Sequence, residues 1–422
     1  MTTLYAGPRL RTGKERGSNG GGVYPELGPL GFSKGASPAL VSTVARLSVL
    51  MPSYAHAHQE MRRRGVVMDG KTVRRITQQL GSEVLTTRRR DLMAWRAGHG
   101  PVGDELAGKR VGVAIDGGRT RLRENRRRCR RKGQRITRRR KYDAMWREPK
   151  LLIIFELDER GRMKRGSRAW IDATFQGPDH LMELLAFHLH RLGASRAETV
   201  AFVSDGAPWI WDRLAWVEQK VGLVDSQIHR ILDWCHAVHH VSVALEALAL
   251  PDQTRQRIYQ RLRQHLRHGR VHHVITELTR RASGKHRDHA VSREIEYFRK
   301  HADHMAYAKL RGLGLPMGSG AIESAIRRVV NQRLKGNGIT WLQDNAEAML
   351  VLRAAALTDR WEDTLDHVRT RMAADRHVDW RWTAPDMSAQ LADPSVDLKP
   401  PKPPPPQSSQ LLENKGVTGI AA

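Results

Sequence analysis

Cysteine is almost absent from this chain of 422 residues, since only Cys129 and Cys235 occur. They form no Cys-x-x-Cys pair, so the sequence predicts neither a zinc ribbon nor a disulfide framework. Apolar runs of about 18 residues are also lacking, and we expect no membrane span. The first residues contain no apolar segment of the kind found in signal peptides. We therefore expect an intracellular, cytoplasmic protein.

Acidic residues are scarce beside basic ones: 44 Asp and Glu stand against 72 Lys and Arg, a formal net charge of +28. Such an excess predicts a polyanionic partner, because each phosphate contact releases condensed counterions. Ribosomal and membrane-surface proteins share this property, so charge alone does not choose among them. Hydrophobic residues make up 40%, enough for a sizeable core, and the length predicts two or three domains.

The first third of the chain reads as an arm followed by helices. Residues 1–35 are rich in Gly and basic residues and predict a flexible arm. Residues 36–105 predict a helical, helix-turn-helix-like DNA-binding region, with helices at about 53–64 and 71–80 that end at Gly65 and Gly81. On the second helix an apolar side lies opposite a polar side that includes Arg74, Arg75 and Gln78. That polar side fits a DNA groove or an ordinary solvated face equally well.

The middle of the chain predicts an α/β domain. Five short runs are rich in branched or aromatic residues and bounded by turn signals; they are 109–116, 151–158, 168–175, 198–205 and 228–234. Leucines at helical spacing over 181–192 predict a helix between the third and fourth strands. Three strands, a helix, a strand, a helix and a strand is the order of an RNase H-like domain. We predict the first part of a mixed-sheet catalytic core of this kind over 106–240.

Residues 119–141 hold fourteen Arg or Lys between the first two strands, which predicts an exposed hairpin or loop that binds phosphates. Its candidate DNA-binding residues are Arg119, Arg126, Arg127, Arg128, Arg130, Arg138 and Arg139. Residues 241–312 predict a helical insertion, and 313–375 complete the core with helices, one of them over about 341–372. The Pro-rich segment 376–422 predicts a disordered tail.

Two acids end predicted strands and are followed by glycine. Asp116 precedes Gly117, and Asp205 precedes Gly206. A carboxylate at a strand end, beside glycines that let a ligand approach, suits a metal ion. The alternative for each is an Asp that caps a turn.

Glu323 lies in the first turn of a predicted helix, which Ser319 can cap and whose apolar stripe contains Ile322, Ile326, Val329 and Val330. It can equally be a helix-dipole acid or an i,i+4 partner of Arg327. Glu347 is the rival third acid. The Glu323 helix continues into a basic track that could lie along a DNA end, with Arg327, Arg328, Asn331, Arg333 and Lys335.

These motifs together resemble bacterial insertion-sequence transposases of the DDE class, close to the ISKra group and more distantly similar to the Mutator-like superfamily. The resemblance spans about 36–372. Its most specific segments are DGGR at 116–119, WREPK at 146–150, SDGA at 204–207 and 318–324; DWCH at 233–236 is similar to the D-x-x-H motif that this superfamily has between its second and third acids. The chain lacks the Cys-rich N-terminal segment that we expect in many relatives.

The resemblance implies that Asp116, Asp205 and Glu323 are catalytic and hold two Mg²⁺ or Mn²⁺ ions. It implies cleavage and strand transfer at inverted repeats of double-stranded DNA, in the nucleoid, by a homodimer or higher oligomer. Other RNase H-like nucleases or resolvases, and a non-catalytic basic DNA-binding protein, are the alternatives.

Asp233 and His236 are auxiliary candidates, which either reach the active site or cap the following helix. For His239 and His240, a structural role is favoured over metal binding. For Trp209 and Trp211, core packing is favoured over base stacking.

Overall fold

The computed structural model describes residues 10–11, 22–23, 31–32, 36–125, 142–282 and 289–376. Contacts divide the chain into two units, the first of which ends at Asp375. Most of the predicted arm, the tail after 376 and six of the predicted DNA-binding residues lie outside the described part; the six are Arg126, Arg127, Arg128, Arg130, Arg138 and Arg139. At the start, β1 (Leu10–Arg11) pairs antiparallel with β2 (Gly22–Val23).

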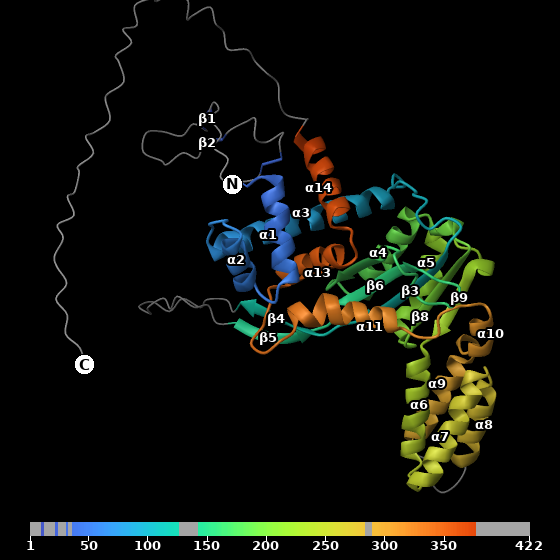
Figure 1. Cartoon of the computed structure of the whole chain (residues 1–422). Coiled ribbons are helices and arrows are strands. Elements are labelled where there is room, and N and C mark those ends of the chain that lie inside the picture. Colours follow the sequence, from blue (N-terminus) through green and yellow to red (C-terminus); the bar gives the residue numbers. More distant parts are fainter. Residues whose placement is uncertain are drawn as a thin grey trace, which may run out of the picture. The chain divides into compact units, whose positions relative to one another are not determined.

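A five-stranded mixed sheet lies at the centre of the first unit (Figure 1). Its strands are β3 (Arg110–Gly117), β6 (Lys150–Glu156), β7 (Trp170–Thr174), β8 (Thr199–Ser204) and β9 (Ile228–Leu232). The spatial order is β7-β6-β3-β8-β9, in which β6 runs antiparallel to β3 and β7, while β8 is parallel to β3 and β9. The five predicted strand runs are confirmed, and the chain is an α/β protein.

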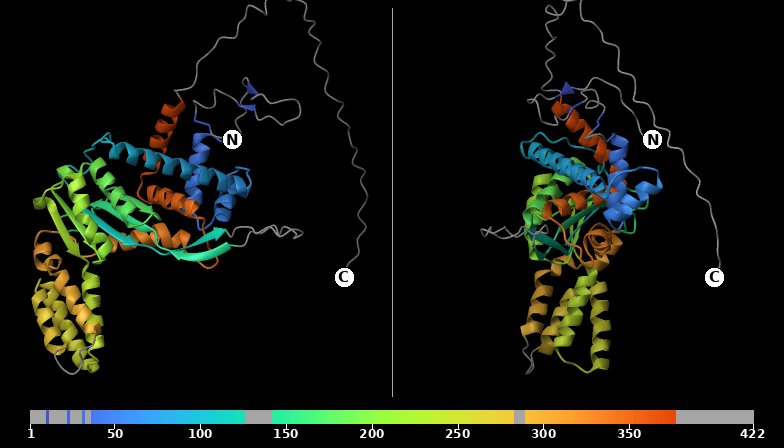
Figure 2. Two further views of the ribbon diagram at one scale, coloured as in Figure 1. Left: turned by 180° about the vertical axis from the view of Figure 1, so that it is seen from behind. Right: turned by 90° about the vertical axis from the view of Figure 1, so that its left-hand side faces the viewer.

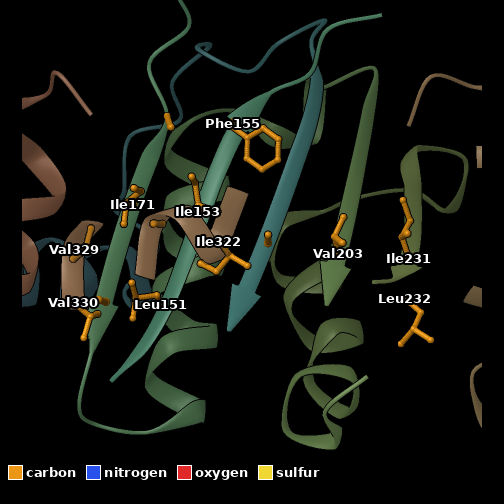
Figure 3. Packing of buried hydrophobic residues seen from close by; sticks show 14 of the residues in the cluster. Leu151, Ile153, Phe155, Ile171, Val203, Ile231, Leu232, Ile322, Val329 and Val330 are labelled. Atoms are coloured by element: carbon orange, nitrogen blue, oxygen red, sulfur yellow. The ribbon is translucent and has the colours of Figure 1, made fainter. Parts of the chain in front are cut away.

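Each face of the sheet is covered by helices, because side chains alternate along its strands. Val111, Val113 and Ile115 point to the face covered by α4 (Pro178–Arg191) and α5 (Pro208–Val221). Ala114 points to the opposite face, where α11 (Gly320–Ile326) and α13 (Gln343–Leu357) pack. On that face, Figure 3 shows Ile322 of α11 among the side chains of β6. Short 3-10 turns, Ala194–Arg196 and Asp225–Gln227, precede β8 and β9.

The helices before the sheet are α1 (Pro38–Leu50), α2 (Tyr54–Arg63) and α3 (Gly70–Arg96). The prediction that a helix ends at Gly81 is wrong, since α3 continues for another four turns. A β-carbon at Gly81 would lie 2.6 Å from Cβ of Ala348 on α13. This glycine therefore permits the close packing of two helices, a tertiary reason that the local sequence signal for a helix end does not contain.

A two-stranded ribbon, β4 (Thr120–Asn125) and β5 (Tyr142–Arg147), continues from the β3–β6 pair. Gly117 is paired with Lys150 in the sheet, the Gly118 N–H donates to the Pro149 carbonyl at 2.8 Å, and Thr120 is paired with Arg147 in the ribbon. The described residues on either side of 126–141 thus form a pair of antiparallel strands, as a hairpin requires.

Residues after β9 are mainly helical, as predicted, and the first helix starts earlier than the predicted insertion. The helices are α6 (Trp234–Ala247), α7 (Asp252–Arg267), α8 (Val271–Ala282), α9 (His289–Lys300) and α10 (Tyr307–Gly312), with a 3-10 turn at Ala302–His304. Helices α6 to α9 run alongside one another (Figure 2) and enclose apolar side chains such as Leu262 and Phe298.

The last helices complete the face of the sheet that α11 covers. Helix α11 passes through a π-helical turn (Arg327–Asn331) into α12 (Gln332–Leu334). The single helix predicted over 341–372 is wrong, because α13 and α14 (Trp361–Arg376) are separated by Asp359, whose φ is +56°. Within the described ranges, no helix combines the length and the apolar character that crossing a bilayer requires.

Candidate active site

Asp116 and Asp205 lie at the carboxyl ends of the neighbouring parallel strands β3 and β8, whose pairing ends with Ala114 and Val203. Asp116 lies two residues after Ala114 on β3 and shares its orientation, toward the face that α11 covers, while Asp205 directly follows Ser204, the last residue of β8. The charge of Asp205 raises the pKa of Asp116, so the two carboxylates are near each other. In open α/β sheets, ligands bind at this carboxyl edge of the parallel strands.

The electrostatics of Asp116 show how close the neighbouring acids are. Burial raises the pKa of Asp116, and the negative charges of Asp205 and Glu148 raise it further, against a hydrogen bond from the Gly117 N–H (2.6 Å) and the charge of His236. Carboxylates that repel one another in this way are stabilised when a cation joins them. The hydrogen bond from the Gly117 N–H is also what the alternative role of Asp116, the capping of a turn, would require.

Asp205 is held by its turn and by the helices after β9. Its Oδ1 accepts a hydrogen bond from the Ala207 N–H at 3.0 Å, and its carbonyl accepts one from the Tyr297 hydroxyl of α9 at 3.1 Å. Gly206 has a φ of +88°, and a β-carbon there would lie 2.9 Å from Leu232. The glycine after this acid is therefore required by the backbone, and α9 buttresses the turn.

Glu148 is an acid to which the sequence analysis gave no role, although it lies in the WREPK segment. A β-carbon at position 117 would lie 1.8 Å from Glu148 Oε1, so its carboxylate occupies the space above Gly117, next to Asp116. Lys150 Nζ donates to Glu148 at 2.7 Å and lies 4.2 Å from the centre of the Trp209 ring. One signal in the sequence could have identified Glu148. It lies two residues before β6, which pairs with the strand of Asp116.

Glu323 is exposed in the first turn of α11, where it was predicted. Ser319 occupies the N-cap position, but the prediction that its side chain caps the helix is wrong: its hydroxyl donates instead to Glu323 Oε1 at 3.3 Å. Among the described residues, neither Arg327 nor any other Lys or Arg forms an ion pair with Glu323. Helix α11 contacts β3 and β6, so Glu323 belongs to the same face as Asp116.

Asp233 anchors the start of α11. It is fully buried at the N-terminus of α6 and accepts hydrogen bonds from the His236 N–H (2.8 Å) and from the Ser319 N–H. Burial opposes ionisation, but these bonds and that of the His236 side chain lower the pKa of Asp233 to about 2. Asp233 therefore caps α6 and also fixes the segment that carries Glu323.

The charges of His236 and of the two strand-end acids act on each other. Its hydrogen bond to Asp233 raises its pKa, burial opposes this, and the charges of Asp233, Asp205 and Asp116 raise it further. By contrast, His240 binds Glu294 (2.5 Å) and stacks on Tyr297 at 3.6 Å, as the structural role predicts.

We call Asp116, Glu148, Asp205 and Glu323 the acidic edge. Asp205 and Glu148 are close enough for their charges to raise the pKa of Asp116, and Glu323 lies on the helix that packs against β3 and β6. Within the described ranges, no group of three or more His, Cys, Asp or Glu side chains is close enough together to hold one metal ion. The donors are nevertheless carboxylates, the ligands that Mg²⁺ prefers, and three of the four have no Lys or Arg partner among described ion pairs.

Glu347, the rival third acid, is buried and fully engaged elsewhere. Its carboxylate accepts hydrogen bonds from Arg88 (2.8 Å), the Thr174 hydroxyl (2.8 Å) and the Phe175 N–H (2.9 Å). Arg88 also binds Asp172 at 2.7 Å, and Asp172 in turn binds His188 at 2.8 Å. We call these residues the paired group; in it Glu347 is a structural acid.

The predicted DNA-binding residues that the structure describes are mostly solvent-accessible. Arg74, Arg75, Arg119, Arg327 and Lys335 are exposed, while Gln78 and Arg328 are half-buried. The prediction that Arg333 belongs to the basic track is wrong, because Arg333 is buried. Its guanidinium lies 5.0 Å from the centre of the Trp341 ring. Trp209 and Trp211 are half-buried and pack on the core, as expected.

No protein-family model matches this chain, and no curated protein or solved structure matches it either. Function is therefore inferred from the site itself.

Proposed function

We propose that this protein is a DNA transposase of the DDE class, which cleaves DNA at the ends of an insertion sequence and joins them to a target. The observation that carries the proposal is the position of Asp116 and Asp205 at the carboxyl ends of adjacent parallel strands, close enough for the charge of one to act on the other. Helix α11, which bears Glu323, packs on the face toward which Asp116 points.

The sheet supports an RNase H-like core. Along the chain, β3, β6 and β7 are followed by α4, β8, α5 and β9, the order of elements from which this fold was predicted. In space, β7, β6 and β3 are antiparallel neighbours, and β8 and β9 extend the sheet as parallel strands. The helices from α6 to α10 would then form the insertion between the second and third acids. The exposed Arg74 and Arg75 on α3 support a helix-turn-helix-like DNA-binding region at α2 and α3.

Asp116, Asp205 and Glu323 would hold two Mg²⁺ or Mn²⁺ ions, with Glu148 beside them. Such ions, when bound, activate the attacking oxygen and stabilise the leaving oxygen of a phosphodiester. The chain itself supplies the orientation of these acids: the Ala207 N–H fixes Asp205, and Asp233 fixes the segment before Glu323. His236, drawn toward these negative charges, can donate a hydrogen bond to a phosphate oxygen.

Cleavage of a supercoiled plasmid that carries the DNA flanking the coding region tests the proposal. With Mg²⁺ or Mn²⁺, the purified protein should nick or linearise the plasmid. Asp116→Asn, Asp205→Asn and Glu323→Gln should each lower this rate at least about a thousandfold, because residues of one catalytic unit fail together. Glu362→Gln, at an exposed acid on α14, is the matched control.

Three outcomes would contradict the proposal. Wild-type cleavage by one of the three variants removes that residue from the mechanism, and DNA binding without any nicking indicates a non-catalytic DNA-binding protein. Cleavage without joined product, when pre-cleaved ends are supplied, indicates a nuclease that lacks strand transfer.

A further inference from the structure

The β4–β5 ribbon has one face turned to the core and one turned away from it. Thr120 and Leu122 are buried: the Thr120 hydroxyl donates to the Leu334 carbonyl at 2.8 Å, and Leu122 forms a bridge with Trp341. Residues directly opposite each other in an antiparallel pair share a face, and successive residues alternate. The side chains of Arg121 and Trp146, which are paired, therefore lie on the face away from the core.

This outer face combines aromatic rings with arginines. Trp146 is 48% exposed and Tyr142 is 45% exposed. The guanidinium groups of Arg119 and Arg121 lie 4.9 Å and 5.8 Å from the centre of the Trp146 ring, and that of Arg123 lies 5.7 Å from the Tyr142 ring. Aromatic rings that lie beside arginines are the combination with which proteins bind single-stranded nucleic acids.

The rings lie beside the acidic edge. Trp146 is two residues before Glu148, whose carboxylate occupies the space above Gly117, and Arg119 is three residues after Asp116. Because the ribbon continues the β3–β6 pair, a ligand on its outer face would extend from the end of the sheet where Glu148 lies.

We propose that Trp146 stacks on an unpaired base of a DNA strand next to the cleavage position, while Arg119 and Arg121 contact its phosphates. An aromatic plane offers a surface to any unstacked base, and the arginines supply the complementary charge. A paired base inside a duplex exposes only its edges to the grooves, so duplex DNA does not gain from the ring. This inference rests on the proposed function only in placing the bound base next to a cleavage position.

The test is binding of the full-length protein, in EDTA to prevent cleavage, to a fluorescein-labelled 20-nucleotide oligo-dT strand and to a 20-base-pair duplex of mixed sequence. Anisotropy titrations give both dissociation constants. Trp146→Ala should weaken binding of the single strand about tenfold, the loss of one stacked base, and change duplex binding less than twofold. Trp146→Phe keeps a ring and should retain most of the single-strand affinity.

Trp216→Ala is the matched control, because Trp216 is 42% exposed but lies on α5, outside the β4–β5 ribbon. It should change neither dissociation constant. The inference is overturned if Trp146→Ala leaves single-strand binding unchanged, if it weakens duplex binding equally, or if Trp216→Ala has the same effect. These results are independent of the plasmid assay, in which Asp116→Asn loses cleavage yet should still bind oligo-dT.

Discussion

The acidic edge and the paired group both contain carboxylates drawn from distant parts of the chain, and they differ in what neutralises them. In the paired group, Arg88 lies between Asp172 and Glu347 and donates a hydrogen bond to each. Burial opposes ionisation of Asp172, yet Arg88 and His188 hold its pKa well below its usual range. At the acidic edge, burial and the neighbouring carboxylates raise the pKa of Asp116. A buried acid with a cationic partner is costly to disrupt, whereas an acid whose charge is uncompensated is a candidate for binding a ligand.

The largest expected effect separates the two candidate third acids. Glu323→Gln should abolish plasmid cleavage and leave thermal stability nearly unchanged, since Glu323 is exposed. Glu347→Gln should retain cleavage below its unfolding temperature but lose about 1–3 kcal/mol of stability, because a buried acceptor of three hydrogen bonds is weakened. Cleavage assays and calorimetry on both variants measure this, and loss of cleavage only in the Glu347 variant would reverse the assignment.

Removal of Arg88 should be the most destabilising single change in the paired group. Arg88→Met leaves two buried carboxylates without their cation and should cost about 3–5 kcal/mol in the free energy of unfolding. Arg96→Ala, which breaks the exposed pair with Glu183, should cost less than about 1 kcal/mol. Urea titrations compare the two, and equal losses would mean that Arg88 does not hold the network together.

The direction in which the stability of the paired group changes with pH follows from Asp172. Its pKa is lowered in the folded state, so its contribution is present above the unfolded value of about 3.9 and is lost as the pH falls through the folded value. The stability difference between wild type and Arg88→Met should accordingly narrow in acid. A difference that widens below pH 4 would contradict this role.

Glu148 should have an intermediate effect on activity. Neutralising it removes a negative charge beside Asp116, so Glu148→Gln should lower cleavage about 10- to 100-fold, as changes around metal ligands do. Glu124→Gln, at an exposed acid on β4, should leave the rate unchanged. If the two variants behave alike in the plasmid assay, Glu148 does not belong to the site.

The smallest effect is a gain in stability. Because the folded-state pKa of Asp116 is raised, its ionised form destabilises the cation-free protein at neutral pH, and this penalty disappears in acid. Asp116→Asn should therefore raise Tm slightly at pH 7 in EDTA, while Asp172→Asn should lower it. A lower Tm for Asp116→Asn would show that this carboxylate is compensated in the fold.

Local sequence determined the strands and the positions of the acids that end them. Branched residues in short runs form β3 and β8, and the Asp-Gly pairs after them mark the edge, because a strand's pattern is set by its own residues. The exposed position of Glu323 in a first helical turn was also predictable. The helix end at Gly81 and the single helix over 341–372 were not, since helix packing against Ala348 and the backbone at Asp359 decided them.

Only the tertiary structure decided which acids are compensated. Nothing near Glu347 in the sequence reveals Arg88, which lies 259 positions away, and nothing near Gly117 reveals that the Glu148 carboxylate fills the space above it. Charge compensation depends on distance in space, and burial strengthens it by removing water. One carboxylate can therefore form a structural ion pair, as Glu347 does with Arg88, while another, such as Asp116, stays uncompensated.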